Sequence, residues 1–255
     1  MNDSLYIAAT GMQAQQQVID SIANNLANVS TPGFKKGRVA FQQLMHADPA
    51  GAAPAPAAGT SGLGISVASV SRDFAPGALA QTGSAMDLAV DGPGFIEVAL
   101  ADGSRGYTRG GTLTVDKDGY LATTDGLALK PGIRIPPGAG TIRIAADGRV
   151  TVQTGADGAA TEVGQIELVR FANPAGLGAQ SGGLYTPSES SGEALPAKAG
   201  SQGLGQLVQG ALENSNVNLT DEMVTLVVAQ RAYEMSSKVI QASDELMSLT
   251  NNLRR

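Results

Sequence analysis

The sequence contains no cysteine, so disulfides, thiol catalysis and thiolate metal sites are all excluded. Tryptophan is absent too, and aromatic residues are scarce. No apolar run reaches the roughly 18 residues that a membrane-spanning helix needs. The opening residues, MNDSLYIAATGMQAQQQ, lack the basic start, apolar core and cleavage site of a signal peptide. We therefore expect no membrane span and no cleaved signal peptide.

No region concentrates charge of one sign. The net charge is −6, and acidic and basic residues are scattered without long runs. Such a chain lacks the basic surface that binds nucleic acid or anionic membranes, so neither partner is expected. At 255 residues the chain is long enough for one or two domains with a real core.

Both ends of the chain carry apolar residues spaced alternately by threes and fours, which places them on one stripe of a helix. The first helix is expected over residues 4–29, stopped by Pro32-Gly33. The last is expected from about residue 218, capped by Asn218 or Thr220. The two stripes are Leu5, Ala8, Met12, Ile19, Ile22, Leu26 and Val29, and Val228, Ala232, Met235, Val239, Ala242, Leu246, Leu249 and Leu253.

The last helix also carries a second stripe, Leu226, Tyr233, Ile240 and Met247. Its apolar face is therefore wider than one partner helix needs, which suits an assembly of several helices. The pattern leaves two arrangements open. The terminal helices could pair inside one chain as a helical hairpin, or they could pack between copies of the chain. The wide apolar face favours packing between copies.

The middle of the chain, about 85–195, is punctuated by Asp-Gly pairs that favour tight hairpin turns. Between these pairs lie β-prone runs whose spacing predicts an antiparallel β domain. The runs are 88–90, 95–100, 112–115, 120–123, 142–145, 149–154 and 165–171.

The predicted fold class is therefore α+β, with the N- and C-terminal helices packing as a coiled coil and a central antiparallel β-rich domain. An Ala/Pro-rich stretch at 46–62 cannot build a core and is expected to form a loop. The expected domains are an N-terminal assembly helix (1–33), a connecting region (34–84), an outer β domain (85–195), a return linker (196–217) and a C-terminal assembly helix (218–255).

Signals for catalysis are weak throughout. The one histidine, His46, has no nucleophile or carboxylate partner that the sequence can place beside it. Residues 116–119 begin like a calcium loop, but position 127 is Leu where a Glu is required. The glycines at 203, 205 and 210 do not have the spacing of a nucleotide fingerprint. We predict that the chain is not an enzyme and has no cofactor and no metal site.

Specific residues at both ends resemble a known family. The segment from Ser21 to Lys36, SIANNLANVSTPGFKK, is similar to the N-terminal signature of the bacterial flagellar rod and hook family. NSNVNLTDEM (214–223) and QRAYE (230–234) resemble its C-terminal signature. DLAVDGPGF (87–95) and YTR (107–109) match its central region. Within the family, the size and the SNVNLTDEM form are most similar to distal rod members, and next to proximal rod members.

The resemblance implies a structural subunit of the basal-body rod. It implies export through the flagellar type III apparatus and polymerisation in the periplasm into a hollow helical shaft that transmits torque to the hook. The implied partners are other copies of the chain, other rod proteins, the hook protein and the P and L ring proteins. The alternatives are a proximal rod protein or a monomeric periplasmic β-domain binding module.

Together, the stripes and the resemblance predict an assembly interface, within which the amides of Asn24, Asn25 and Asn28 can fix the register between helices. The interface residues are Leu5, Met12, Ile19, Ile22, Asn24, Asn25, Leu26, Asn28, Val29, Leu226, Val228, Tyr233, Met235, Val239, Ile240, Leu246, Met247, Leu249 and Leu253.

Overall fold

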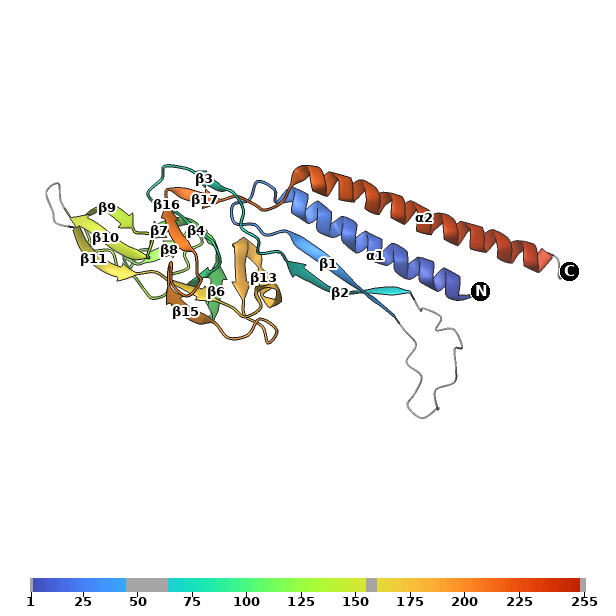
Figure 1. Cartoon of the computed structure of the whole chain (residues 1–255), viewed down its shortest axis with the longest axis horizontal. Coiled ribbons are helices and arrows are strands. Elements are labelled where there is room, and N and C mark those ends of the chain that lie inside the picture. Colours follow the sequence, from blue (N-terminus) through green and yellow to red (C-terminus); the bar gives the residue numbers. More distant parts are fainter. Residues whose placement is uncertain (1, 45–63, 155–159, 253–255) are drawn as a thin grey trace, which may run out of the picture. The chain divides into compact units, whose positions relative to one another are not determined.

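The computed structural model describes residues 2–44, 64–154 and 160–252 (Figure 1). Long helices occur at the two ends and antiparallel strands between them, so the α+β class with a β-rich middle is confirmed. The predicted loop at 46–62 and His46 lie outside the described residues. The chain divides into two compact units. The helical unit comprises Met1–Ala27, Gly37–Ser71 and Asn218–Arg255, and the β unit comprises Asn28–Lys36 and Arg72–Val217.

The helical unit contains α1 (Asn2–Ala27) and α2 (Leu219–Asn252), which lie side by side, together with strands β1 (Gly37–Gln43) and β2 (Ile65–Arg72) (Figure 1). The amide of Thr220 donates to the side-chain oxygen of Asn218, which caps α2. Asp221 and Glu222 place negative charge in its first turn, where the helix dipole favours it.

The two helices run antiparallel in a defined register (Figure 1). Asn25 contacts Glu222, and the α-carbon of Gly11 faces Ser236, so in both pairs the residue numbers add up to 247. Asn2 therefore lies opposite Glu245. Because α2 has 34 residues and α1 has 26, the last turns of α2 continue beyond the start of α1.

The β unit is built from antiparallel sheets, the largest with six strands in the order β13-β14-β6-β5-β12-β15. These strands are β13 (Gly178–Gln180), β14 (Leu184–Thr186), β6 (Arg105–Thr108), β5 (Phe95–Ala99), β12 (Glu167–Arg170) and β15 (Leu195–Lys198). Two short 3₁₀ turns, Pro174–Gly176 and Ser181–Gly183, flank β13.

Among the described residues, the β unit also contains three smaller sheets. One has the order β16-β4-β7-β8, one has β11-β10-β9, and β17 pairs with β3. Their bounds are β16 (Gln206–Gln209), β4 (Asp87–Asp91), β7 (Gly110–Val115), β8 (Leu121–Thr123), β11 (Ala160–Gln165), β10 (Arg149–Thr154), β9 (Ala139–Ile144), β17 (Ala211–Glu213) and β3 (Leu79–Gln81). Each β-prone run predicted from the sequence coincides with one of these strands. The predicted division of the chain into five functional domains stays a prediction.

Asp-Gly pairs form tight turns between strands, as predicted. The β5–β6 turn passes through Gly103 at φ 81°, and the β9–β10 turn passes through Gly148 at φ 89°. Both angles lie in the left-handed region, where glycine carries no steric penalty. The Asp-Gly pair at 157–158 lies outside the described residues.

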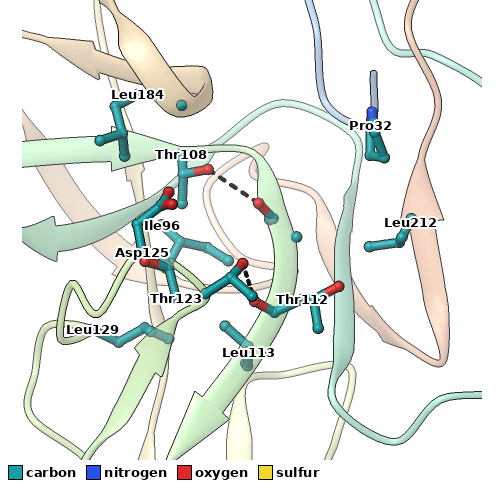
Figure 2. Close-up of a pocket in the computed structure, with 14 residues that line it drawn as sticks. Pro32, Ile96, Thr108, Thr112, Leu113, Thr123, Asp125, Leu129, Leu184 and Leu212 are labelled. Atoms are coloured by element: carbon teal, nitrogen blue, oxygen red, sulfur yellow. Dashed lines mark hydrogen bonds between the residues drawn. The ribbon is translucent and has the colours of Figure 1, made fainter. Parts of the chain in front are cut away.

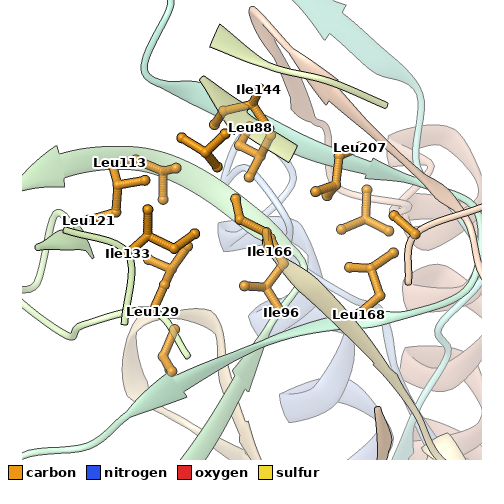
Figure 3. Close-up of a cluster of buried hydrophobic side chains, with 14 of the residues drawn as sticks. Leu88, Ile96, Leu113, Leu121, Leu129, Ile133, Ile144, Ile166, Leu168 and Leu207 are labelled. Atoms are coloured by element: carbon orange, nitrogen blue, oxygen red, sulfur yellow. The ribbon is translucent and has the colours of Figure 1, made fainter. Parts of the chain in front are cut away.

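Two hydrophobic clusters hold the β unit together. The larger is aliphatic and gathers side chains from several sheets, including Leu88, Ile96, Ile166 and Leu168, all at most 1% exposed (Figure 3). The smaller is aromatic, and its rings meet edge to face, as between Tyr107 and Phe171 at 4.8 Å. In the same cluster, burial raises the pKa of Tyr185 to about 12.

Candidate assembly surface and a buried ion cluster

The predicted interface residues of α1 are mostly half-buried within their own unit. Only Ile22 and Asn25 are fully buried, and Asn24 is exposed. Asn28 and Val29 follow the end of α1 and belong to the β unit, where both are half-buried. The remaining predicted residues of this helix, all half-buried, are Leu5, Met12, Ile19 and Leu26.

The two stripes of α2 differ in exposure. In the second stripe, Leu226, Ile240 and Met247 are half-buried, and Tyr233 is 38% exposed. Glu222 and Ala229 lie three or four residues from members of this stripe, on the same side of the helix, and both are buried. Glu222 contacts α1 directly, so the second stripe lies on the face of α2 that meets α1.

The large side chains of the first stripe are exposed in the described chain. Val228 is 61% exposed, Met235 64% and Val239 50%. Leu246 and Leu249 are similarly exposed, and Leu253 lies outside the described residues. A continuous row of large apolar side chains along one helix is uncommon on a solitary soluble protein and indicates a surface for binding. The structure thus separates the two stripes, which the sequence could not assign.

An apolar groove of about 530 Å³ opens between the helices beside this exposed stripe. Ala8 and Gly11 of α1 and Met235 and Val239 of α2 line it, together with Ile65 at the start of β2. The groove and the first stripe therefore form one continuous apolar surface.

The buried amide of Asn25 links three elements of the helical unit. It is 1% exposed, and its nitrogen donates to the carbonyl of Gly37 at 3.0 Å and to Glu222 at 3.1 Å. Its oxygen accepts from the amide of Gly37 at 2.8 Å. One side chain thus ties α1 to α2 and to the start of β1.

Asn25→Ala is expected to loosen the helical unit. The substitution leaves the backbone groups of Gly37 and the carboxylate of Glu222 without this partner in a buried place, at a cost of about 2–4 kcal/mol. Hydrogen exchange should show faster exchange in α1 and α2 and unchanged protection in the β unit. Asn24→Ala, at the exposed neighbouring position, is the control. Equal exchange in the two variants would contradict the role given to Asn25.

The β unit contains a buried ion cluster that the sequence did not reveal: Lys35, Arg109 and Glu213. Lys35 Nζ donates to Glu213 Oε1 at 2.6 Å, and Arg109 Nε donates to Glu213 Oε2 at 3.0 Å. All three side chains are at most 3% exposed. Two cations meet one carboxylate, and carbonyl groups balance the excess, with Arg109 also donating to the carbonyls of Gly92 and Gly94 at 2.7 Å.

The cluster shifts the pKa values of its members. Burial works to raise the pKa of Glu213, but the charge of Arg109 and the hydrogen bonds from Arg109 and Lys35 outweigh burial and hold this pKa below its ordinary value. Burial also lowers the pKa of Lys35, and the neighbouring Glu213 opposes that change only in part.

A smaller cavity of about 210 Å³ lies in the β unit (Figure 2). Its polar lining is mostly threonine, and these hydroxyls bond to nearby backbone or, for Thr112, to the carboxylate of Asp87 at 2.8 Å. Thr108 donates to the carbonyl of Gly110 at 3.1 Å, and Thr124 donates to that of Thr112 at 3.3 Å. No group of three acidic, histidine or cysteine side chains able to hold a metal occurs in the described residues. In that part of the chain, neither α1 nor α2 combines the length and apolarity needed to cross a membrane.

Comparison with known proteins agrees with this order of elements along the chain, in which helices at the two ends flank a β-rich middle. Three family profiles match in order along the chain. They are "Flagella basal body rod protein" at residues 5–35, "Flagellar hook protein FlgE/F/G D1 domain" at 89–152 and "Flagellar basal body rod FlgEFG protein C-terminal" at 208–253.

Relatives match over nearly the whole chain. The flagellar basal-body rod protein FlgG of Borreliella burgdorferi is 42% identical over 100% of both chains. That of Caulobacter vibrioides is 38% identical over 98% of this chain and 99% of its own. The rod protein FlgF of the same organism is 32% identical over 96% of this chain and 95% of its own. The chain belongs to the flagellar basal-body rod protein family and is a structural rod subunit of the distal type.

Proposed function

We propose that this chain polymerises through α1 and α2 into the distal rod, a hollow helical shaft that transmits torque to the hook. The exposed first stripe of α2 carries this proposal. A single chain leaves Val228, Met235 and Val239 in water, and packing against helices of neighbouring copies would bury them. In the assembled shaft, the terminal helices pack as a coiled coil and the β unit faces outward.

The proposal includes which residues meet which neighbour. The second stripe of α2 packs on α1 of the same chain, and the first stripe meets a neighbouring copy. The apolar residues of α1, among them Leu5, Met12 and Ile19, are only half-buried, and their exposed parts also contact a neighbouring copy. The sequence-predicted interface is thus divided into a part within the subunit and a part between subunits.

The rod position rests on the relatives. Within Caulobacter vibrioides, identity is higher to FlgG, at 38%, than to FlgF, at 32%. This order favours the distal position over another rod position. The Ala/Pro-rich stretch 46–62, a candidate for setting rod stiffness, lies outside the described residues.

The proposed partners follow from the position. They are further copies of this chain, other rod proteins, the hook protein and the P and L ring proteins, with the flagellar type III apparatus exporting the chain without signal cleavage. The proposed location is the basal body, where the rod crosses the periplasm. No catalytic role is proposed.

The test is deletion of this chain followed by imaging of isolated basal bodies. We expect the distal rod to be missing and the outer rings to be absent, with both restored when the intact chain is supplied on a plasmid. Rods of normal length in the deletion strain would refute the proposal.

The pairing of α1 with α2 inside one chain keeps a second candidate open, a monomeric β-domain module closed by a helical hairpin. Sedimentation of the purified chain separates the two candidates. A polymerising subunit forms species that grow with concentration, whereas a closed module stays at the mass of one chain.

A further inference from the structure

Three segments of the β unit that are far apart in the sequence converge on Glu213. The first follows α1, the second follows β2 and the third precedes α2. Besides Lys35 and Arg109, Glu213 Oε1 accepts from the amide of Gly77 at 2.8 Å. Lys35 Nζ also donates to the carbonyl of Ala75 at 2.8 Å. The carboxylate thus joins segments 33–36, 72–78 and 211–216 in one buried place.

The first and third segments run parallel to each other. The amide of Gly33 donates to the carbonyl of Glu213 at 2.6 Å, and the amide of Lys36 donates to the side chain of Asn216 at 2.8 Å. The pairs 33–213 and 36–216 advance in the same direction along both segments. The first segment is attached to α1 at its beginning, and the third is attached to α2 at its end.

This orientation determines how the contacts carry tension. When the two terminal helices are pulled apart, force enters one parallel segment at its start and leaves the other at its end. The segments are therefore pulled along their length in opposite directions, and all contacts between them are loaded together. Contacts loaded together must break together, which needs more force than contacts that open one after another.

We propose that Lys35, Arg109 and Glu213 form a mechanical clamp that shields the β unit from tension arriving through α1 and α2. Lys35 and Glu213 are 178 positions apart, so the contact closes a loop containing nearly all of the β unit. While the clamp holds, force passes directly from the first segment to the third. The need for such shielding in a torque-transmitting shaft rests on the proposed function, but the clamp itself is a property of one chain.

Single-molecule force spectroscopy on the full-length chain tests the clamp. Because the sequence has no cysteine, engineered thiols give unique attachment points. Handles at Ser30→Cys and Thr220→Cys, both exposed positions, load the clamp. Handles at Lys117→Cys and Glu162→Cys, also exposed, load the sheets without loading the clamp.

In the clamp geometry we expect Glu213→Gln to lower the rupture force at least about twofold. The length released, about 600 Å for a loop of 178 residues, should stay the same. Forced rupture follows the unfolding barrier, not the equilibrium stability. In the second geometry the variant should rupture at the wild-type force. Lys35→Met keeps the apolar stem but removes the ammonium group, and it should also lower the rupture force. This variant replaces Glu213→Gln in the test if Glu213→Gln does not fold.

The matched control is Asp87→Asn. Asp87 is a buried carboxylate of the same unit that accepts from the hydroxyls of Thr82 and Thr112 and lies outside the clamp. Its variant should rupture at the wild-type force when the clamp is loaded. Unchanged force in both clamp variants would overturn the proposal, as would an equal proportional fall in both pulling geometries. Neither result depends on polymerisation, so the clamp can fail while the proposed rod function stands.

Discussion

Met235→Asp should abolish polymerisation and leave the single chain folded. Met235 is 64% exposed in the subunit, so a carboxylate there stays in water and costs the isolated fold little. In the proposed polymer the same position is covered by a neighbouring helix. Burying an unpaired carboxylate costs several kcal/mol at each interface, and every 1.4 kcal/mol is a tenfold loss in affinity. We expect at least about a hundredfold weaker association and no motility.

Gln241→Asp is the matched control. It adds the same charge to α2 at an exposed position that lies on neither stripe. Electron microscopy and sedimentation should find polymer for this variant and monomer for Met235→Asp, with equal helical content by circular dichroism. Normal swimming of a Met235→Asp strain would rule out the exposed stripe as the contact between subunits.

Ile240→Asp is expected to behave differently although it is only five residues away. Ile240 is half-buried on the face of α2 that meets α1, so a charge there loosens the subunit itself. Leu26→Asp, at a half-buried position on α1, should act the same way. Both variants should lose helical protection in hydrogen exchange before any polymer forms, whereas Met235→Asp should keep it.

The strands were predictable because their signals are local. Alternating apolar residues between Asp-Gly pairs mark both the strand and its end, as around Gly103 and Gly148. The short strands β13 to β17 gave no such signal. β17, for example, has three residues, and its partner β3 is more than a hundred positions away. Pairing over that distance depends on the tertiary fold, which local propensity does not encode.

The helices were predictable as elements, but the direction each stripe faces was not. Periodicity identifies residues that share a face, but it does not say which of the two apolar stripes of α2 meets α1. The contact between Asn25 and Glu222 decides which face meets α1. That contact joins residues 197 positions apart, so it can be identified only from the folded structure.

The ion cluster was missed although each member lies in or beside a segment that carries the family resemblance. Lys35 is in SIANNLANVSTPGFKK, Arg109 ends YTR, and Glu213 directly precedes NSNVNLTDEM. A single charged residue in a motif is more often solvated than buried, so sequence reasoning had no physical ground to pair them. The one available signal was that each of the three charged residues lies in or directly beside a segment that resembles the family.

Glu213→Leu should lower the free energy of unfolding of the β unit by about 3–5 kcal/mol, because it leaves Lys35 and Arg109 buried without their carboxylate. Thermal or denaturant unfolding of the β-unit signal measures the loss. Glu97→Leu, which removes the 3.7 Å ion pair between the half-buried Glu97 and the exposed Arg105, is the control and should cost below about 1 kcal/mol.

The pH dependence separates the lost charge from the altered shape at this position. The folded pKa of Glu213 lies below its ordinary value of 4.5, so its contribution to stability is complete above that value and is lost as pH falls through the folded pKa. In acid the carboxylate of Glu213 becomes protonated, so the wild-type chain then lacks this charge just as the Glu213→Leu variant does. The stability difference between wild type and Glu213→Leu should therefore be largest near neutral pH and shrink on acidification. A difference that stays constant down to strongly acidic pH would mean that leucine fails at this position because of its shape, and that the charge of Glu213 contributes little.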